Sequence, residues 1–159
     1  MKKIRIIAAL LLMLAVIVSC TKKTDDAAEI ETIVELNWLT NLETAVGKAN
    51  ENGKTVFVNF TGSDWCGWCI KLKSEVFNHK EFADYAEKNL ILVELDFPQR
   101  IEQTEETKEY NKTVAQKFGV RGFPTIVLVN GSGSEIGRTG YMEGGPVAYV
   151  EHLKGFIGR

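Results

Sequence analysis

Two cysteines three residues apart, Cys66 and Cys69, directly follow the β-rich run 55–60 and open a segment with helical character. This order of strand, cysteine pair and helix constrains the fold, because it places both cysteines in the first turn of a helix. Residues three apart lie on one face of a helix, close enough for their sulfur atoms to bond. The pair could be a redox couple, half of a zinc site or a structural disulfide.

A redox couple explains the pair best. A disulfide across two intervening residues closes a very small loop and removes little chain entropy, so it stabilises a fold poorly. Zinc sites need about four ligands, usually including a second paired cluster, whereas the only histidines are His79 and His152, far apart in sequence. Because cysteines carry electrons themselves, we expect no metal and no organic cofactor.

Cys66 is the expected nucleophile and Cys69 the expected resolving cysteine. At a helix N-terminus, unpaired backbone N–H groups and the helix dipole favour an anion, so the Cys66 thiolate should be stabilised. It would attack a partner's disulfide, and Cys69, more shielded inside the helix, would resolve the mixed disulfide. The spacer residues Gly67 and Trp68 would set the redox poise of the pair.

The N-terminal residues have the layout of a secretory signal peptide. A basic start precedes the apolar run 6–18, which is too short for an ordinary membrane-spanning helix. The following Ser19 and Cys20 resemble the lipobox of bacterial lipoproteins, in which the cysteine becomes the lipidated N-terminus. We therefore predict a lipoprotein signal peptide at residues 1–19 and lipid attachment at Cys20. An uncleaved anchor and a soluble secreted product are the alternatives.

The rest of the chain suits one exported domain. Without residues 1–19 it carries 16 basic and 21 acidic side chains, a formal balance of −5 with no basic stripe, so nucleic acid is not an expected partner. Residues 20–33 are polar and charged, which is typical of a flexible tether. Residues 34–159 can bury an adequate core. Nothing demands a dimer, so we expect a monomer.

The residue pattern of this domain predicts alternating helices and strands. Thr40 and Glu43 form a capping box for a helix that ends before Gly53, and Pro146 opens a last helix whose Val147, Val150, Leu153 and Ile157 should face inward. Between them we expect helical segments at 69–76, 81–89 and 104–118 and strands at 55–60, 90–95, 125–130 and 135–139. This order predicts an α/β fold with a mixed central sheet flanked by helices on both faces.

Two motifs together resemble the thioredoxin superfamily over roughly residues 36–157. They are WCGWC, residues 65–69, and FGVRGFPTIVLVNGSGSEIGRTGY, residues 118–141. Within the superfamily, FTGSDWCGWC is similar to exported, often lipid-anchored thioredoxin-like proteins of bacteria. The resemblance implies a thioredoxin-like fold, a cis peptide bond before Pro124, and an apolar substrate-binding patch around the sulfur atoms. That patch would comprise Trp65, Trp68, Phe123 and Pro124.

The sequence departs from the thioredoxin pattern at three places. The spacer is Gly67 and Trp68 instead of Gly-Pro, so the family's redox potential cannot be assumed. Asn59 stands where thioredoxins usually carry a buried acid that takes the resolving cysteine's proton, and an amide does not titrate. Either Asp64, Glu75 or water replaces that acid, or proton transfer is slower. The segment 96–100 belongs to a longer connection than usual, interpreted as a solvated insertion, with a partner surface as the alternative.

The resemblance implies a thiol–disulfide oxidoreductase of the cell envelope, lipid-anchored through Cys20 and facing the periplasm. The outer membrane is favoured over the inner, because Thr21 rather than Asp follows Cys20. The expected partners are cysteine-containing envelope proteins and a membrane electron donor. Reduction is favoured over oxidation or isomerisation. The alternatives from other classes are a binding module that holds partners without turnover and a small zinc-binding domain.

Overall fold

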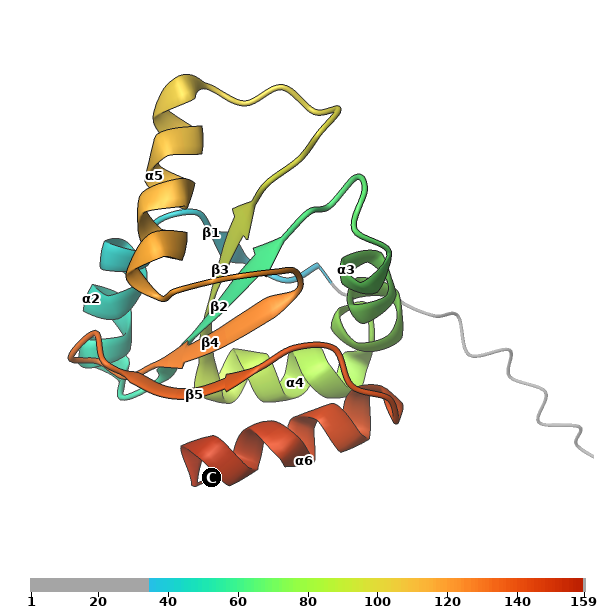
Figure 1. The fold of residues 1–159 in the computed structure, drawn as a ribbon. Coiled ribbons are helices and arrows are strands. Elements are labelled where there is room, and N and C mark those ends of the chain that lie inside the picture. Colours follow the sequence, from blue (N-terminus) through green and yellow to red (C-terminus); the bar gives the residue numbers. More distant parts are fainter. Residues whose placement is uncertain (1–34, 159) are drawn as a thin grey trace, which may run out of the picture. The chain divides into compact units, whose positions relative to one another are not determined.

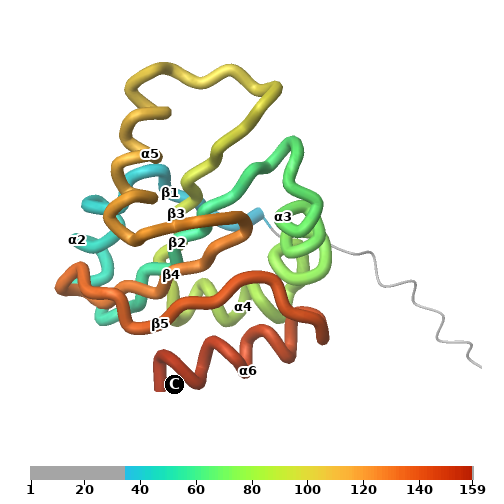
Figure 2. Tube along the Cα trace, in the orientation of Figure 1, coloured from blue at the N-terminus to red at the C-terminus, as the bar shows by residue number. Residues whose placement is uncertain are grey.

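The computed structural model describes residues 35–158. The predicted signal peptide, the lipid-attachment residue Cys20 and the tether 20–33 lie outside the described residues. The centre of the fold is a five-stranded sheet in the order β1-β3-β2-β4-β5. Helices cover both faces of this sheet, as Figures 1 and 2 show. The predicted α/β fold with a mixed sheet is therefore confirmed.

The sheet combines parallel and antiparallel neighbours. Strands β1 and β2 both run parallel to β3, whereas β4 is antiparallel to β2 and β5 is antiparallel to β4. The strands are β1 (Trp38–Leu39), β2 (Thr55–Thr61), β3 (Leu90–Asp96), β4 (Thr125–Val129) and β5 (Glu135–Thr139). The edge strand β1 is missing from the predicted elements, because two residues are too short for an alternating pattern.

The described range contains five α-helices and one π-helical turn. They are α2 (Leu42–Asn52), α3 (Gly67–Leu72), the π-helical turn η1 (Lys73–Phe77), α4 (Lys80–Asn89), α5 (Glu105–Lys117) and α6 (Gly145–Ile157). Within residues 35–158, none of the helices has the length and apolar character needed to cross a membrane.

Two local predictions about the helices are wrong. Helix α2 is capped by Asn41 rather than Thr40, since the Asn41 Oδ1 accepts the Thr44 backbone N–H at 2.8 Å. In α6, Val147 is 59% exposed instead of facing inward. The buried stripe of α6 is centred on Tyr149 and Leu153, and Val147 lies well off that stripe at 100° per residue.

Side chains of the central strand β2 alternate between two cores. Phe57 belongs to the core formed with α4, α6 and the segment 72–77. Val56, Val58 and Phe60 belong to the core under α2 and α5. Because successive strand residues point to opposite faces, Asn59 shares the face of Phe57. This is the face covered by the helical segment that the cysteines open.

Candidate active site

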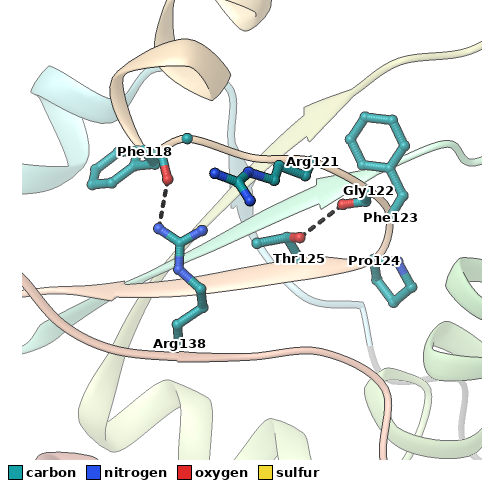
Figure 3. Close-up of a pocket in the computed structure, with 8 residues that line it drawn as sticks. Phe118, Arg121, Gly122, Phe123, Pro124, Thr125 and Arg138 are labelled. Atoms are coloured by element: carbon teal, nitrogen blue, oxygen red, sulfur yellow. Dashed lines mark hydrogen bonds between the residues drawn. The ribbon is translucent and has the colours of Figure 1, made fainter.

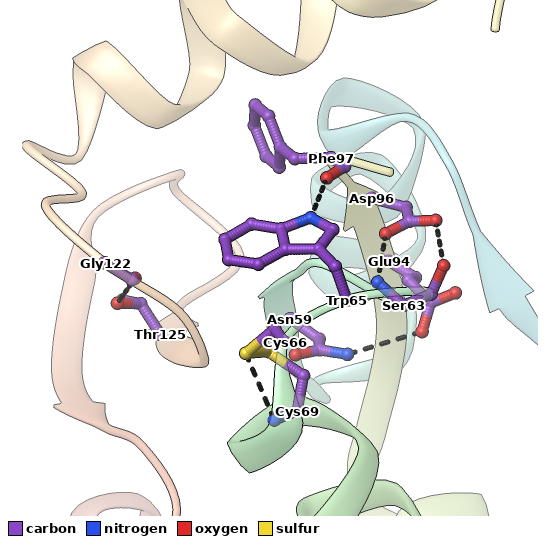
Figure 4. The surroundings of a disulfide bond; sticks show 10 residues. All are labelled: Asn59, Ser63, Trp65, Cys66, Cys69, Glu94, Asp96, Phe97, Gly122 and Thr125. Atoms are coloured by element: carbon purple, nitrogen blue, oxygen red, sulfur yellow. Dashed lines mark hydrogen bonds between the residues drawn. A yellow bond between two sulfur atoms is a disulfide. The ribbon is translucent and has the colours of Figure 1, made fainter. Parts of the chain in front are cut away.

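Cys66 is the N-cap residue of α3, and its sulfur is bonded to the sulfur of Cys69. Strand β2 ends at Thr61, and a short loop leads from it to this helix. The Cα atoms of the two cysteines are 5.2 Å apart, and the Cys66 Sγ accepts the backbone N–H of Cys69 at 3.3 Å. Figure 4 shows this disulfide and its surroundings. The strand, the cysteine pair and the helix thus follow one another as predicted.

Aromatic side chains from three loops contact one another next to this motif. The rings of Trp65 and Phe123 meet edge to face with centroids 6.0 Å apart, and those of Phe97 and Phe123 stack at 5.0 Å. The Trp65 Nε1 donates a hydrogen bond to the Phe97 carbonyl at 2.7 Å. We call Trp65, Phe97 and Phe123 the aromatic cluster. It links the loop before the cysteines to two segments distant in sequence.

Gly62 makes room for the indole of Trp65. A Cβ atom at position 62 would lie 2.6 Å from both the Cε2 and the Nε1 of that ring. This distance is far below van der Waals contact, so any side chain there would displace the indole from the aromatic cluster.

An open pocket of about 410 Å³ adjoins the aromatic cluster. Trp68 is 57% exposed, and its ring centroid lies 5.1 Å from that of Tyr141. The Phe123–Pro124 peptide bond is cis. The pocket is lined by Trp68, Phe123, Pro124, Tyr141, Met142 and Glu143. Three of the four residues predicted to bind substrate therefore share one pocket, and the fourth, Trp65, adjoins it through Phe123.

The loop that carries Phe123 and Pro124 is tied to the sheet by polar contacts. The Thr125 Oγ1 donates to the Gly122 carbonyl at 2.7 Å. The Arg138 guanidinium donates to the Phe118 carbonyl at 2.6 Å. Figure 3 shows these residues around a second open cavity of about 650 Å³. Both contacts hold the start of β4 and the end of α5 in place around the loop.

The connection after β3 contacts the site through Phe97, while Gln99, Arg100 and Ile101 are exposed to solvent, in agreement with its interpretation as a solvated insertion. The Asp64 carboxylate accepts the backbone N–H groups of Gln99, Arg100 and Ile101 at 2.9, 2.6 and 3.1 Å. The adjacent Phe97 stacks in the aromatic cluster. The backbone donors of this solvated segment are thus bound by the loop that precedes the cysteines.

The hydrogen bonds to Asp64 predict a pH effect. The bond from the Gln99 backbone, followed by those from Arg100 and Ile101, holds the pKa of Asp64 below its usual range. A carboxyl whose pKa is lower in the folded state stabilises the fold above its unfolded pKa and loses this contribution as the pH falls through its folded pKa. We expect the amide resonances of residues 99–101 to keep their positions as the pH falls through about 3.9 and to shift only below it.

The control for this prediction is Asp64→Asn, which keeps a hydrogen-bond acceptor but cannot titrate. It should remove the low-pH shift at residues 99–101 and leave the amides of α5 unchanged. A titration of these three amides at or above the ordinary pKa of aspartate would contradict the loop geometry.

Glu94 is the functional candidate that the sequence reading missed. It is paired in register with Asn59 across β2 and β3, and the Asn59 Nδ2 donates to the Glu94 Oε2 at 3.3 Å. Burial raises the pKa of Glu94, and the positive charge of Lys73 partly opposes this rise. A carboxyl inside the otherwise apolar run LILVEL was the available signal, because glutamate is rarely buried without a partner.

The two carboxyls expected to replace the thioredoxin acid have other partners. Asp64 binds the backbone of residues 99–101. Glu75 accepts the hydroxyl of Tyr141 at 2.7 Å and lies 3.7 Å from the Lys71 Nζ. Asn59 itself is 3% exposed. The position expected for the buried acid is therefore occupied by a buried amide that contacts Glu94.

The described residues offer no ligand set for the zinc alternative. Across residues 35–158 there is no group of three or more His, Cys, Asp or Glu side chains that could hold a metal ion. His79 contacts the Ser74 carbonyl, and His152 contacts the Thr139 hydroxyl. Neither histidine is placed with the cysteines by these contacts.

Comparison with known proteins agrees with this architecture. The family model of the thioredoxin-like domain matches residues 42–152. The disulfide bond reductase DsbH of Chlamydia pneumoniae is 37% identical over 119 residues, which cover 75% of this chain and 71% of the relative. The thioredoxin-related protein DsbJ of the same organism is 29% identical over 140 residues, which cover 88% of this chain and 38% of the relative.

A solved structure resembles the whole described fold. The structure of a DsbH oxidoreductase superposes with a TM-score of 0.74 at 32% identity, over 88% of this chain and 94% of that one. The matched family model spans both the cysteine pair and the cis-proline loop. This protein belongs to the thioredoxin-like family.

Proposed function

We propose that this protein-disulfide oxidoreductase reduces disulfides in cysteine-containing proteins of the cell envelope. The observation that carries the proposal is the Cys66–Cys69 disulfide at a helix N-terminus, next to an open pocket lined by Trp68 and the cis-proline loop. An extended substrate segment could lie along this pocket and bring its own disulfide to Cys66. The similarity to a disulfide bond reductase supports the reducing direction.

The reducing reaction uses both cysteines in turn. The Cys66 thiolate attacks the substrate disulfide, so that a bond from Cys66 to one substrate sulfur forms and the substrate S–S bond breaks. The released substrate sulfur leaves as a thiolate and takes a proton from solvent. The Cys69 thiolate then attacks the Cys66 sulfur, which forms the Cys66–Cys69 bond and frees the second substrate thiol. Two electrons pass from the protein's dithiol to the substrate.

The proposed location and partners follow from this reaction and from the N-terminal sequence. Each turnover leaves an oxidised pair, so an electron donor must reduce it again, and a membrane protein is the proposed donor. Residues 1–19 act as the signal peptide, lipidated Cys20 anchors the protein, and residues 20–33 tether a monomeric domain of residues 34–159. Attachment to the outer membrane, facing the periplasm, is proposed over the inner membrane. The similarity to Dsb proteins supports an envelope location.

The equilibrium reduction potential of the Cys66–Cys69 pair tests the direction. Trp65 and Trp68 are 40% and 57% exposed beside the pair, and their fluorescence should report its redox state in dithiothreitol or glutathione buffers. A strongly reducing potential, below about −200 mV, is the expected result. A potential of about −120 mV, typical of strong disulfide oxidants, would show instead that the protein makes disulfides. A variant with both cysteines replaced by serine is the fluorescence control.

A further inference from the structure

A buried amide and a mostly buried carboxyl lie on the sheet face that the cysteine-bearing helix covers. Asn59 shares the face of Phe57 in β2, and Glu94 shares the face of Leu92 in β3, because residues two apart in a strand point the same way. Phe57 and Leu92 belong to the same core as Leu72 of α3. The strand register pairs Asn59 directly with Glu94. Both polar groups therefore lie on the sheet face that is covered by the helix carrying the disulfide.

The Asn59 amide lies between the Glu94 carboxyl and the cysteine sulfur atoms in Figure 4. Its Nδ2 donates to the Glu94 Oε2 at 3.3 Å. Its Oδ1 is buried and has no hydrogen-bond partner within residues 35–158. In the view of Figure 4 the amide stands between the sulfur atoms and the Glu94 carboxyl, with Oδ1 on the sulfur side.

The unpaired Asn59 Oδ1 can gain a hydrogen-bond donor from the cysteine pair only when the pair is reduced. A buried acceptor without a partner costs free energy. The disulfide has no hydrogen to donate, but a cysteine thiol does. Reduction of the pair therefore adds thiol donors on the side toward which Oδ1 lies in Figure 4.

We propose that Glu94, acting through the Asn59 amide, controls the protonation of the reduced cysteine pair. This inference rests on the proposed function and names a positioning residue for it. An ionised Glu94 only accepts hydrogen bonds, so it holds the Asn59 Nδ2 and turns Oδ1 toward the sulfurs, where Oδ1 favours a thiol. A protonated Glu94 donates to Oδ1, so the amide can turn and offer Nδ2 to a thiolate.

The same arrangement balances the proton in the resolving step. Before Cys69 attacks, its proton passes through solvent water to the Glu94 carboxylate, and the amide turns to donate to the Cys69 thiolate. The bond between Cys69 and Cys66 then forms, and the bond between Cys66 and the substrate sulfur breaks. The substrate leaves as a thiolate and is protonated, while Glu94 returns its proton to solvent. Cys69 and Glu94 together carry one negative charge before and after the proton moves from the thiol to the carboxylate.

Burial and three neighbouring groups shift the pKa of Glu94, and so the pH range in which it can take up and release a proton. Burial is the main influence and raises the pKa of Glu94. Asp96, on the same strand, acts in the same direction, whereas Lys73 of the turn η1 and the hydrogen bond from Asn59 lower it. A raised pKa brings the carboxyl closer to the pH at which thiols exchange, which suits a group that takes and returns a proton.

The test is the thiolate titration of the fully reduced protein, followed by ultraviolet absorbance. Glu94→Gln removes the charge but keeps a side chain of the same shape, and Gln can donate to the Asn59 Oδ1. We expect the higher thiol pKa of the pair to fall by about one unit. In an Asn59→Leu background, which removes the amide at similar size, the same Glu94→Gln change should have less than half this effect. Glu75→Gln, the matched control, should leave the titration in place.

Several results would overturn the inference. They are an unchanged titration in Glu94→Gln, an equal shift in Glu75→Gln, and a full shift that persists without the amide. Carbon-13 NMR of the Glu94 carboxyl in the unsubstituted protein gives a second measurement that needs no variant. Its titration should move between the oxidised and reduced forms, and one common curve would contradict the coupling. Reduction of insulin disulfides by the unsubstituted protein tests the proposed function separately, because the titrations require no substrate.

Discussion

Replacement of Cys66 by serine should abolish disulfide reduction, with a loss of about a thousandfold or more. Cys66 is the N-cap of α3, where the sulfur sits at the helix terminus and accepts the Cys69 backbone N–H. A serine hydroxyl at this position cannot form the sulfur–sulfur bond on which the reaction depends. The measurement is the initial rate of insulin reduction with dithiothreitol as the electron source.

Replacement of Cys69 by serine should have a different outcome. The first attack by Cys66 can still occur, but the mixed disulfide cannot be resolved from inside the protein. We expect covalent adducts between protein and substrate to accumulate on non-reducing gels and to disappear on reduction. The variant with both cysteines replaced is the control and should form none. Retention of the same partners by that double variant would favour the binding module over the enzyme.

Replacement of Phe57 by alanine should cost about 3–5 kcal/mol of the free energy of unfolding. The Phe57 side chain is fully buried, and its ring centroid lies 6.1, 5.8 and 5.7 Å from those of Trp38, Phe77 and Phe82. Its removal leaves a cavity where the central strand meets the helices behind the cysteines. Urea unfolding of the oxidised protein, followed by far-ultraviolet circular dichroism, measures the loss.

The matched control for Phe57 is Val147→Ala on the exposed side of α6. Because Val147 is 59% exposed, this change should alter the free energy of unfolding by no more than about 0.5 kcal/mol. Comparable losses in both variants would contradict the arrangement of the α6 stripe. A loss below about 1 kcal/mol for Phe57→Ala would contradict the packing of the central strand.

Much of this fold could be predicted because its signals are local. The run of β2 and the cysteine spacing each fix a short segment, and Gly53 ends α2 in the left-handed conformation expected of a helix terminus. Val147 shows the limit of such patterns. A helix of 13 residues has several apolar positions, and only the packing of Tyr149 against Phe77 and Phe82 decides which of them face inward.

The site needed information that no local pattern carries. Asn59 was noticed for lacking a charge, but Glu94 lies 35 residues later, and only the register of two parallel strands makes them a pair. A shift of one residue would turn Glu94 to the opposite face. The contacts of the connection after β3 were missed for a similar reason. The polar residues of this connection gave no sign that Asp64 binds its backbone or that Phe97 packs in the aromatic cluster with Trp65.

The aromatic cluster has a consequence for protein engineering. The indole of Trp65 depends on space left by Gly62, on a carbonyl supplied by Phe97 and on the ring of Phe123. These contributions come from separate loops, so the tetrapeptide Cys-Gly-Trp-Cys is not a portable module. Transplanting it into another scaffold would move the sulfur atoms without the aromatic cluster that lies beside them. A successful graft would have to carry all three loops together.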